Sequence, residues 1–280
     1  MGNVKTKMDY SIITINYNNC EGLRRTIESV VAQTCGDFEY IVIDGGSTDG
    51  SGGVIKQDAQ QIDYWVSEPD EGIYNAMNKG VAQAHGEYCL FMNSGDMFHD
   101  KKVVELLHRF ADKSDIIYGN AFRVDRVVEY PDEITGFYMF NNAICHQSVL
   151  IRRDLLVQKP YEEDYKIVAD WKHMFALLIL QGASYRHVNI TVCDYDTNGI
   201  STENWAQVLE EREKALKDML PKRIYDDYYR ISCQEESMNN SKKVYDAVHK
   251  VQSGSVDEKF VIGSLRLLNF LRRIKHFFEV

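Results

Sequence analysis

Short apolar runs alternate with amphipathic segments through the first half of the chain. Strands that are buried on both faces are expected at 11–17, 40–44, 63–67, 87–92 and 115–118. Helices are expected between and after them, at 22–33, 54–61, 73–84 and 102–110. This alternation is typical of an α/β fold, in which a largely parallel sheet is covered by helices on both faces.

The second half follows a less regular pattern. Strands are expected at 123–130, 144–152 and 185–195, and helices at 165–180 and 203–219. Pro221 is expected to end the last of these helices, because proline cannot continue one. The polar stretch from there to about residue 255 is predicted to be loosely packed helix.

Polar side chains follow several of the predicted strands, at the point where each strand ends. They are Asn16, Asp44, Glu68 and Asp96. In open parallel sheets, ligands bind at the carboxyl ends of the strands. The sequence therefore predicts a binding site at this edge of the sheet.

Composition excludes some classes of partner. The 280 residues include 32 Lys and Arg against 42 Asp and Glu, which gives a formal net charge of −10 and disfavours nucleic acid as a partner. The six cysteines show neither a CxxC pair nor zinc-ligand spacing, and this is typical of buried thiols in a reducing compartment. Neither a signal peptide nor a run of about 20 apolar residues is evident, so a cytoplasmic location is expected.

Two loops at predicted strand ends carry residues that can bind a ligand or a metal ion, and each loop also has a plain structural interpretation. The glycines of Asp44–Gly50 let the backbone approach a ligand, or they simply form a turn. Asp96, in Asn93-Ser94-Gly95-Asp96, can hold a hard divalent cation, or it caps the next helix. The phosphate-binding patterns GxGxxG and GxxxxGK[ST] are both absent.

Two further polar residues, Asp170 and His146, lie at the start of predicted elements. Asp170 lies at the start of a predicted helix, where it can act as a general base or favour the helix dipole. His146 precedes or begins an apolar strand, where a histidine is most often a satisfied residue of the core or its rim.

Five motifs occur in one order along the chain: ITINYN, IDGGSTDG, EPDEGIYNAMNKG, NSGD and ADW. Together they resemble the family 2 glycosyltransferases, which are inverting enzymes. The resemblance covers roughly residues 9–195 and is strongest to bacterial members that build surface polysaccharides.

The resemblance implies the GT-A fold. This is an α/β fold with a mixed, mostly parallel central sheet flanked by helices and a Rossmann-like nucleotide-binding half. Residues 1–200 would form the catalytic domain, with a nucleotide-sugar-binding half at 9–120 and an acceptor-binding half at 121–200. Residues 201–280 would form a helical C-terminal extension with a basic amphipathic tail.

The family also implies donor-binding residues. Asn16 and Tyr17 would contact the nucleotide base, and Asp44 would hydrogen-bond uracil. The residues expected on the diphosphate side are Gly72, Asn78, Lys79 and Gly80.

The remaining implied roles concern the reaction itself. Asp96 would hold a divalent cation, Mn²⁺ or Mg²⁺, against the diphosphate. Asp170 would be the catalytic base that deprotonates the acceptor hydroxyl. His146 and Trp171 are expected on the acceptor side.

The sequence departs from the family in two places. The family often has consecutive acids where this chain has Gly95-Asp96, so one metal-facing carboxylate is missing. The Q/R-x-x-R-W motif of processive members is also absent after Asp170. We expect transfer of one sugar from a nucleotide-sugar, a UDP-sugar, to a hydroxyl of a glycan or a polyprenyl-linked glycan in polysaccharide biosynthesis.

Two other functions remain open at this point. A nucleotidyltransferase on a related sheet would have a Gly-rich basic loop after the first strand, and Asn18–Glu21 is not such a loop. A catalytically inactive protein that binds nucleotide-sugars is favoured by Gly95 and disfavoured by Asp170.

The end of the chain differs in charge from the rest. Phe260–Val280 places leucines, an isoleucine and phenylalanines on one helical arc, with Arg266, Arg273 and Lys275 at its edges. This pattern is typical of a helix that lies in a membrane interface with anionic lipid, although a helix packed on the catalytic domain has a similar pattern. We therefore expect peripheral attachment to the inner face of the cell membrane, a hypothesis that liposome pelleting of a chain lacking this segment would test.

Overall fold

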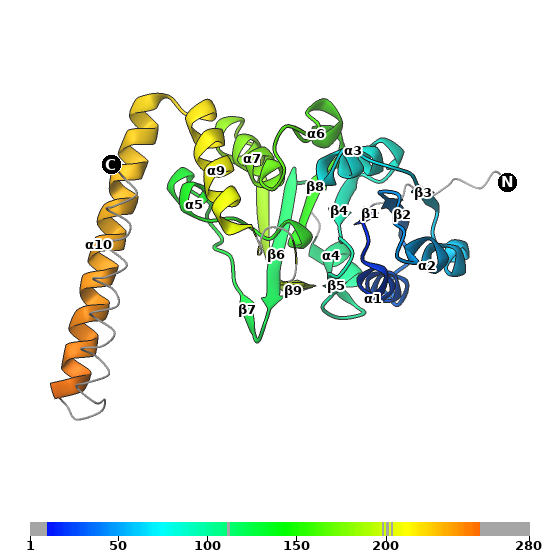
Figure 1. The fold of residues 1–280 in the computed structure, drawn as a ribbon, viewed down its shortest axis with the longest axis horizontal. Helices are drawn as coiled ribbons and strands as arrows, with labels where there is room; N and C mark the ends of the chain where they lie inside the picture. The colour runs from blue at the N-terminus through cyan, green and yellow to red at the C-terminus, as the bar shows by residue number, and fades with distance from the viewer. Residues whose placement is uncertain (1–9, 111–112, 198, 200–201, 203, 253–280) are drawn as a thin grey trace. The chain divides into compact units, whose positions relative to one another are not determined.

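The structure is a computed structural model, and it describes residues 10–110, 113–197, 199, 202 and 204–252. The chain divides into two compact units, Met1–Met219 and Leu220–Val280. The first unit contains the sheet and most of the described helices (Figure 1). The second contains the long helix α10 (Lys222–Gln252).

One mixed sheet forms the centre of the first unit. Its strands are β1 (Tyr10–Asn16), β2 (Phe38–Asp44), β3 (Tyr64–Ser67), β4 (Tyr88–Phe91), β5 (Met97–Phe98), β6 (Ile116–Arg123), β7 (Arg126–Val128), β8 (Val149–Arg152) and β9 (Tyr185–Tyr195). Their order is β3-β2-β1-β4-β8-β6-β9-β5, and β7 pairs with β6. The strands β3, β2, β1 and β4 are parallel, whereas β8 runs antiparallel to both β4 and β6. The expected α/β fold with a mixed sheet is confirmed.

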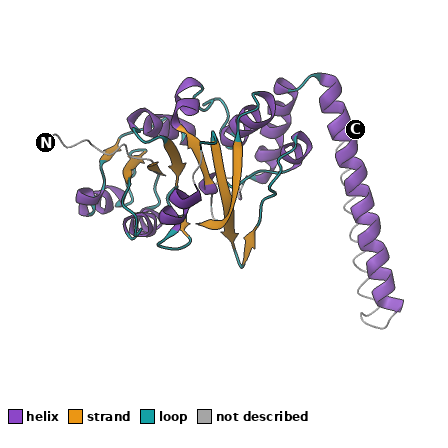
Figure 2. Ribbon diagram, turned by 180° about the vertical axis from the view of Figure 1, so that it is seen from behind, coloured by secondary structure: helices purple, strands orange, loops and turns teal. Residues whose placement is uncertain are grey.

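Helices flank this sheet (Figure 2). The α-helices of the first unit are α1 (Cys20–Val31), α2 (Ser51–Gln57), α3 (Ile73–Gln83), α4 (Val103–Phe110), α5 (Gly136–Asn141), α6 (Arg153–Gln158), α7 (Ala169–Phe175) and α9 (Trp205–Met219). Short 3₁₀ turns occur at η1 (Ala59–Gln61) and η2 (His146–Ser148), and η3 (Ala176–Leu180) is one π-helical segment that continues α7.

The parallel half positions polar groups at one edge. All seven residues of β1 are buried, because the strand is central and packed on both faces. Its register places Asn16 opposite Asp44 at the ends of β1 and β2. On α3, a Cβ at Gly80 would lie 2.5 Å from Ile13 Cγ2, so the missing side chain allows this helix to approach β1 closely.

The structure corrects several elements of the second half. The expected strand at 144–152 begins only at Val149, because His146–Ser148 forms a 3₁₀ turn. The expected strand at 123–130 is a short hairpin partner of β6, and the chain turns at Val124, where φ is 62°. The helix of this half, by contrast, begins next to Asp170 as expected, at Ala169, and η3 continues it to Leu180.

The helix α9 belongs to the first compact unit, which ends at Met219. The expected end of the catalytic domain near residue 200 remains a prediction. The Glu211 carboxylate on α9 accepts the backbone N–H of Ile167 (2.9 Å), and Arg212 donates to Asn142 O (3.0 Å). These contacts fix α9 to the body of the first unit.

Within the described parts of both units, no helix is long and apolar enough to cross a membrane. The basic amphipathic segment Phe260–Val280 lies outside the described residues, so the expected membrane contact remains a prediction.

Candidate active site

A cavity of about 1450 Å³ opens at the carboxyl ends of β1 and β4. One side is lined by the end of β1, the Gly45-Gly46 turn and the start of α3. The other walls come from η2, from α7 and from α9. Of the sequence-predicted residues, the cavity brings together Asn16, Tyr17, Gly72, Asp96, His146, Asp170 and Trp171.

The predicted base-binding residues lie at the end of β1. Tyr17 is 67% exposed, so its ring is available at the cavity mouth. Asn16 is buried and donates from Nδ2 to Asp44 Oδ1 (2.6 Å). Its Oδ1 has no hydrogen-bond partner among the described residues, so a buried acceptor remains unsatisfied next to the cavity.

Asp44 lies beneath this wall and is fully buried. Its carboxylate accepts hydrogen bonds from Asn16, from the hydroxyl and backbone N–H of Ser47, and from the hydroxyl of Ser67. Burial opposes ionisation, but these hydrogen bonds outweigh it and lower the pKa of Asp44. Asp44 is therefore an anionic anchor for the loop, and direct contact with a base would require one serine hydroxyl to turn away.

The residues expected on the diphosphate side separate into two groups. Gly72 lies at the N-terminus of α3 and lines the cavity. The other three do not line it: Asn78 hydrogen-bonds Tyr161 and Glu163, Lys79 pairs with Glu68 (3.0 Å), and Gly80 packs on β1. In this structure Asn78 and Gly80 serve helix packing.

Asp96 is the most constrained carboxylate of the cavity. The Asp196 backbone N–H donates to its Oδ1 (2.8 Å), and Gln147 Nε2 donates to its Oδ2 (2.7 Å). Only 4% of the residue is exposed, and burial raises its pKa to about 7, with a smaller contribution from the Asp196 charge. A carboxylate in this environment favours a nearby positive charge.

The missing side chain of Gly95 leaves space for the Asp196 carboxylate near Asp96. A Cβ at Gly95 would lie 2.7 Å from Asp196 Oδ2, and φ at Gly95 is 109°, which L side chains rarely adopt. The absent side chain thus leaves space for Asp196, which follows β9. The Asp196 carboxylate thus lies beside the Asp96 loop, with Arg25 Nη2 3.7 Å from its Oδ2.

The oxygen groups around Asp96 suit a hard divalent cation. Asp96 and Asp196 supply carboxylates, and Asn93 lines the cavity with a buried Oδ1 that has no hydrogen-bond partner in the described structure. Mg²⁺ and Mn²⁺ prefer oxygen ligands and are typically held by one or two carboxylates. The side chains present therefore fit such an ion.

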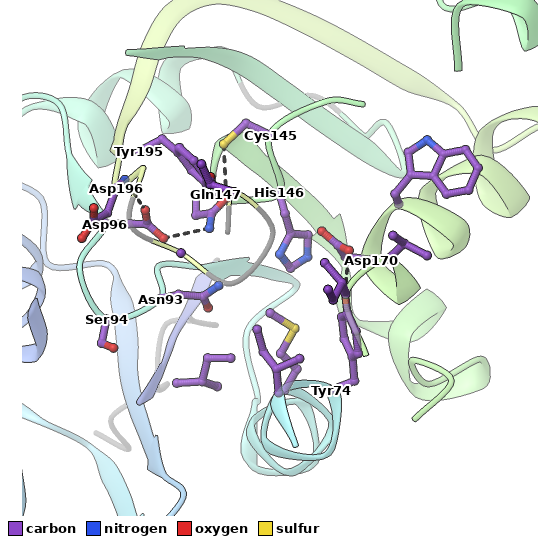
Figure 3. A pocket seen from close by; sticks show the side chains of 18 of the residues that line it. Tyr74, Asn93, Ser94, Asp96, Cys145, His146, Gln147, Asp170, Tyr195 and Asp196 are labelled. Atoms are coloured by element: carbon purple, nitrogen blue, oxygen red, sulfur yellow. Dashed lines mark hydrogen bonds between the residues drawn. The ribbon is translucent and has the colours of Figure 1, made fainter. Parts of the chain in front are cut away.

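Asp170 lies in the first turn of α7, on the other side of the cavity from Asp96 (Figure 3). The Tyr74 hydroxyl, from α3, donates to Asp170 Oδ1 (2.7 Å). Burial, together with the charge of Asp170, raises the pKa of Tyr74 well above its ordinary value, so the phenol stays a donor. This bond fixes the orientation of the carboxylate toward the cavity.

The two residues expected on the acceptor side lie in the cavity wall. His146 stacks on Phe91 (4.8 Å between ring centres), and its Nε2 shares a hydrogen bond with the Tyr161 hydroxyl (2.8 Å). Burial lowers the pKa of His146, which favours the neutral ring. The Trp171 indole N–H donates to the carbonyls of Met139 and Asn142, so its polar edge is already satisfied.

The family follows from comparison with known proteins. The model for glycosyl transferase family 2 matches residues 11–163. An uncharacterized glycosyltransferase of Mycobacterium tuberculosis is 33% identical over 203 residues, which cover 69% of this chain and 76% of that relative. The chain belongs to glycosyl transferase family 2. A PGL/p-HBAD biosynthesis glycosyltransferase of Mycobacterium bovis is 29% identical over 209 residues, 68% of this chain and 77% of that protein.

Solved structures support the fold of this glycosyltransferase. Staphylococcus aureus TarS 1–349 in complex with UDP-GlcNAc has a TM-score of 0.61 at 19% identity, over 79% of this chain and 70% of that one. A second TarS structure has a TM-score of 0.60 at 21% identity, over 79% of this chain and 42% of that chain. A mannosyltransferase of Pyrobaculum calidifontis in complex with GDP-Man and Mn²⁺ has a TM-score of 0.61 at 16% identity, over 95% of this chain and 81% of that chain.

Sequence reasoning missed four residues of this site. Tyr74, Gln147, Asp196 and Arg212 each contact a predicted residue from a distant segment. Tyr74 lies within a quoted motif, and Gln147 follows His146, so both had a local signal. Asp196 and Arg212 had none, because only the folded sheet and α9 bring them to the cavity.

The raised pKa of Asp96 predicts that the free energy of unfolding depends on pH. An unfolded chain ionises this group near its ordinary pKa of 3.8, whereas the folded protein retains the proton up to about pH 7. Between these values the folded state holds a proton that the unfolded state has lost, so the free energy of unfolding falls as the pH rises, by up to about 1.4 kcal/mol per pH unit. We expect Asp96→Asn to remove this loss, and therefore to gain stability relative to wild type as the pH rises from about 4 to about 7.

Thermal unfolding in EDTA, measured for both proteins across this range, tests the expectation. EDTA is needed because a bound cation would stabilise the ionised form. If the difference between the two proteins stays constant with pH, burial does not raise the pKa of Asp96.

Proposed function

We propose that this glycosyltransferase moves one sugar from a UDP-sugar to a hydroxyl of a glycan or polyprenyl-linked glycan, with inversion at the anomeric carbon. The observation that carries the proposal is the Asp170 carboxylate, which Tyr74 holds in the cavity on the side away from Asp96. This separation supports a general base on one wall of the cavity and a cation-holding carboxylate on the other.

The donor would lie along the β1 edge. Tyr17 would pack on the base and Asn16 would offer its unsatisfied acceptor, while Asp44 would hold the loop beneath them. Gly72, at the start of α3, would face the diphosphate. We assign no direct diphosphate contact to Asn78 or Gly80, and Lys79 would reach the diphosphate only by leaving Glu68.

Asp96 and Asp196, with Asn93, would hold the divalent cation, Mn²⁺ or Mg²⁺. When bound, the cation supplies positive charge to the departing diphosphate, as a Lewis acid does, without a proton transfer. The second carboxylate also weakens the argument for an inactive binding protein, because that argument depended on the acid missing at position 95.

Asp170 would act on the acceptor. Its carboxylate takes the proton of the acceptor hydroxyl as the oxygen forms its bond to the anomeric carbon, and the bond from that carbon to the diphosphate oxygen breaks. Attack from the face opposite the leaving group inverts the configuration. One well-placed base is sufficient, because an alcohol nucleophile needs only to lose its proton.

The first test concerns the base. We expect Asp170→Asn to bind UDP with wild-type affinity, measured by calorimetry, and to lose transfer by a factor of about 10² to 10⁴ because the amide cannot take a proton. The donor for the transfer assay is the nucleotide-sugar that the wild-type protein hydrolyses from a panel.

Asp164→Asn is the matched control, because Asp164 is exposed and lies outside the cavity. Transfer at the wild-type rate by Asp170→Asn would show that Asp170 is not the base.

The second test concerns the cation. We expect Asp196→Asn to weaken Mn²⁺ binding about tenfold or more in the presence of UDP, because one of two carboxylate ligands is lost. Electron paramagnetic resonance of free Mn²⁺ measures this affinity without turnover.

Asp194→Asn is a suitable control, since that carboxylate lies two residues away and contacts His99 instead. Equal Mn²⁺ affinities for Asp196→Asn and Asp194→Asn would exclude Asp196 as a ligand.

A further inference from the structure

We propose that α9 forms the acceptor subsite and that the ring of Trp205 packs against a sugar of the acceptor. This inference rests on the proposed function, because it concerns the substrate whose hydroxyl Asp170 would deprotonate. The subsite would bind a carbohydrate that presents the C–H face of its ring.

One stripe of α9 faces the cavity. Trp205, Val208 and Arg212 all line it, and their spacing of three and four residues places them on a single helical face. The stripe extends about 10 Å along the helix axis, which is enough for a monosaccharide or a longer glycan.

Anchors at the middle of α9 hold this face in position. Arg212 lies over the Trp171 ring (4.3 Å) and donates to the carbonyls of Phe140 and Asn142 at the end of α5. Glu211 accepts the backbone N–H groups of the segment just before α7. Both anchors attach α9 to the wall that carries Asp170, and the hydroxyl that reacts at this wall belongs to the acceptor.

The Arg212 guanidinium is suited to a structural role here. Burial lowers its pKa to about 10, which leaves it protonated at neutral pH. Its Nη2 donates to carbonyl oxygens and its plane covers Trp171, so the arginine is part of the wall that supports the stripe.

Trp205 is the member of the stripe whose side chain is most exposed. The residue is 59% exposed although it lines the cavity, whereas Val208 is 7% exposed. Its indole makes no hydrogen bond and no ring contact with another described residue. An exposed indole at a cavity mouth offers a rigid apolar plane with one polar edge, which is a suitable surface for a sugar ring.

The kinetic experiment uses methyl glycosides as acceptors, since their sugar ring is their main apolar surface. We expect Trp205→Ala to raise the KM for the glycoside about fivefold to tenfold. The KM for nucleotide-sugar in donor hydrolysis stays at its wild-type value, and Trp205→Tyr restores most of the acceptor affinity. Leu209→Ala, at a similarly exposed position of α9 that does not line the cavity, leaves both values unchanged.

A second experiment needs no turnover. In protein labelled with 5-fluorotryptophan, the three tryptophans give three ¹⁹F signals, and Trp205→Tyr identifies that of Trp205. We expect this signal to shift when a methyl glycoside is added to the complex with UDP.

Two results would overturn the inference: equal glycoside KM values for wild type and Trp205→Ala, or a Trp205 signal that no glycoside shifts. Failure of the proposed function looks different, since the wild-type protein would then hydrolyse no nucleotide-sugar at all.

Discussion

The buried carboxylate of Asp96 holds three separate segments of this site together. It lies between the Gln147 side chain and the Asp196 backbone, so it joins the loop between β4 and β5 to η2 and to the segment after β9. Burial makes its ionisation costly, as its pKa of about 7 shows. A cation bound beside Asp96 would offset the cost of ionising this carboxylate. The geometry of the cavity and its affinity for a cation therefore depend on each other.

The two walls of the cavity have different origins. The wall proposed for the donor follows from the parallel sheet, because β1 and β2 end side by side and bring Asn16, Tyr17 and Asp44 together. The wall proposed for the acceptor includes α7 and α9, which are not part of the sheet. The bond from Tyr74 to Asp170 joins the walls, so placement of the donor-side helix α3 also places the proposed base.

Much of this arrangement was predictable from local sequence. Continuous apolar runs marked β1, β2 and β4, and the polar residues at their ends marked the site, because strand ends of a parallel sheet meet at one edge. The short elements of the second half were not predictable in the same way. At 144–152 the pattern of a strand was overridden by tertiary contacts that bury His146 and Gln147 in a 3₁₀ turn.

Residues whose position depends on long-range packing could not be predicted from local sequence. The Asp196 carboxylate occupies the space that a side chain at Gly95 would take, and neither residue signals the other along the chain. Conversely, Asn78 and Gly80 lie in a family motif, yet in the structure they pack α3 against its neighbours. A motif fixes which residues occur together, whereas the fold decides which of them face the ligand.

The stereochemistry of the product tests the central claim most directly. With water in place of the acceptor, ¹H NMR identifies the anomer that is released first from an α-linked UDP-sugar that the protein hydrolyses. Direct attack assisted by Asp170 on the face opposite the diphosphate predicts the β-anomer, which mutarotation then converts slowly to the mixture. Initial release of the α-anomer would contradict the account, because retention requires a different arrangement of catalytic groups.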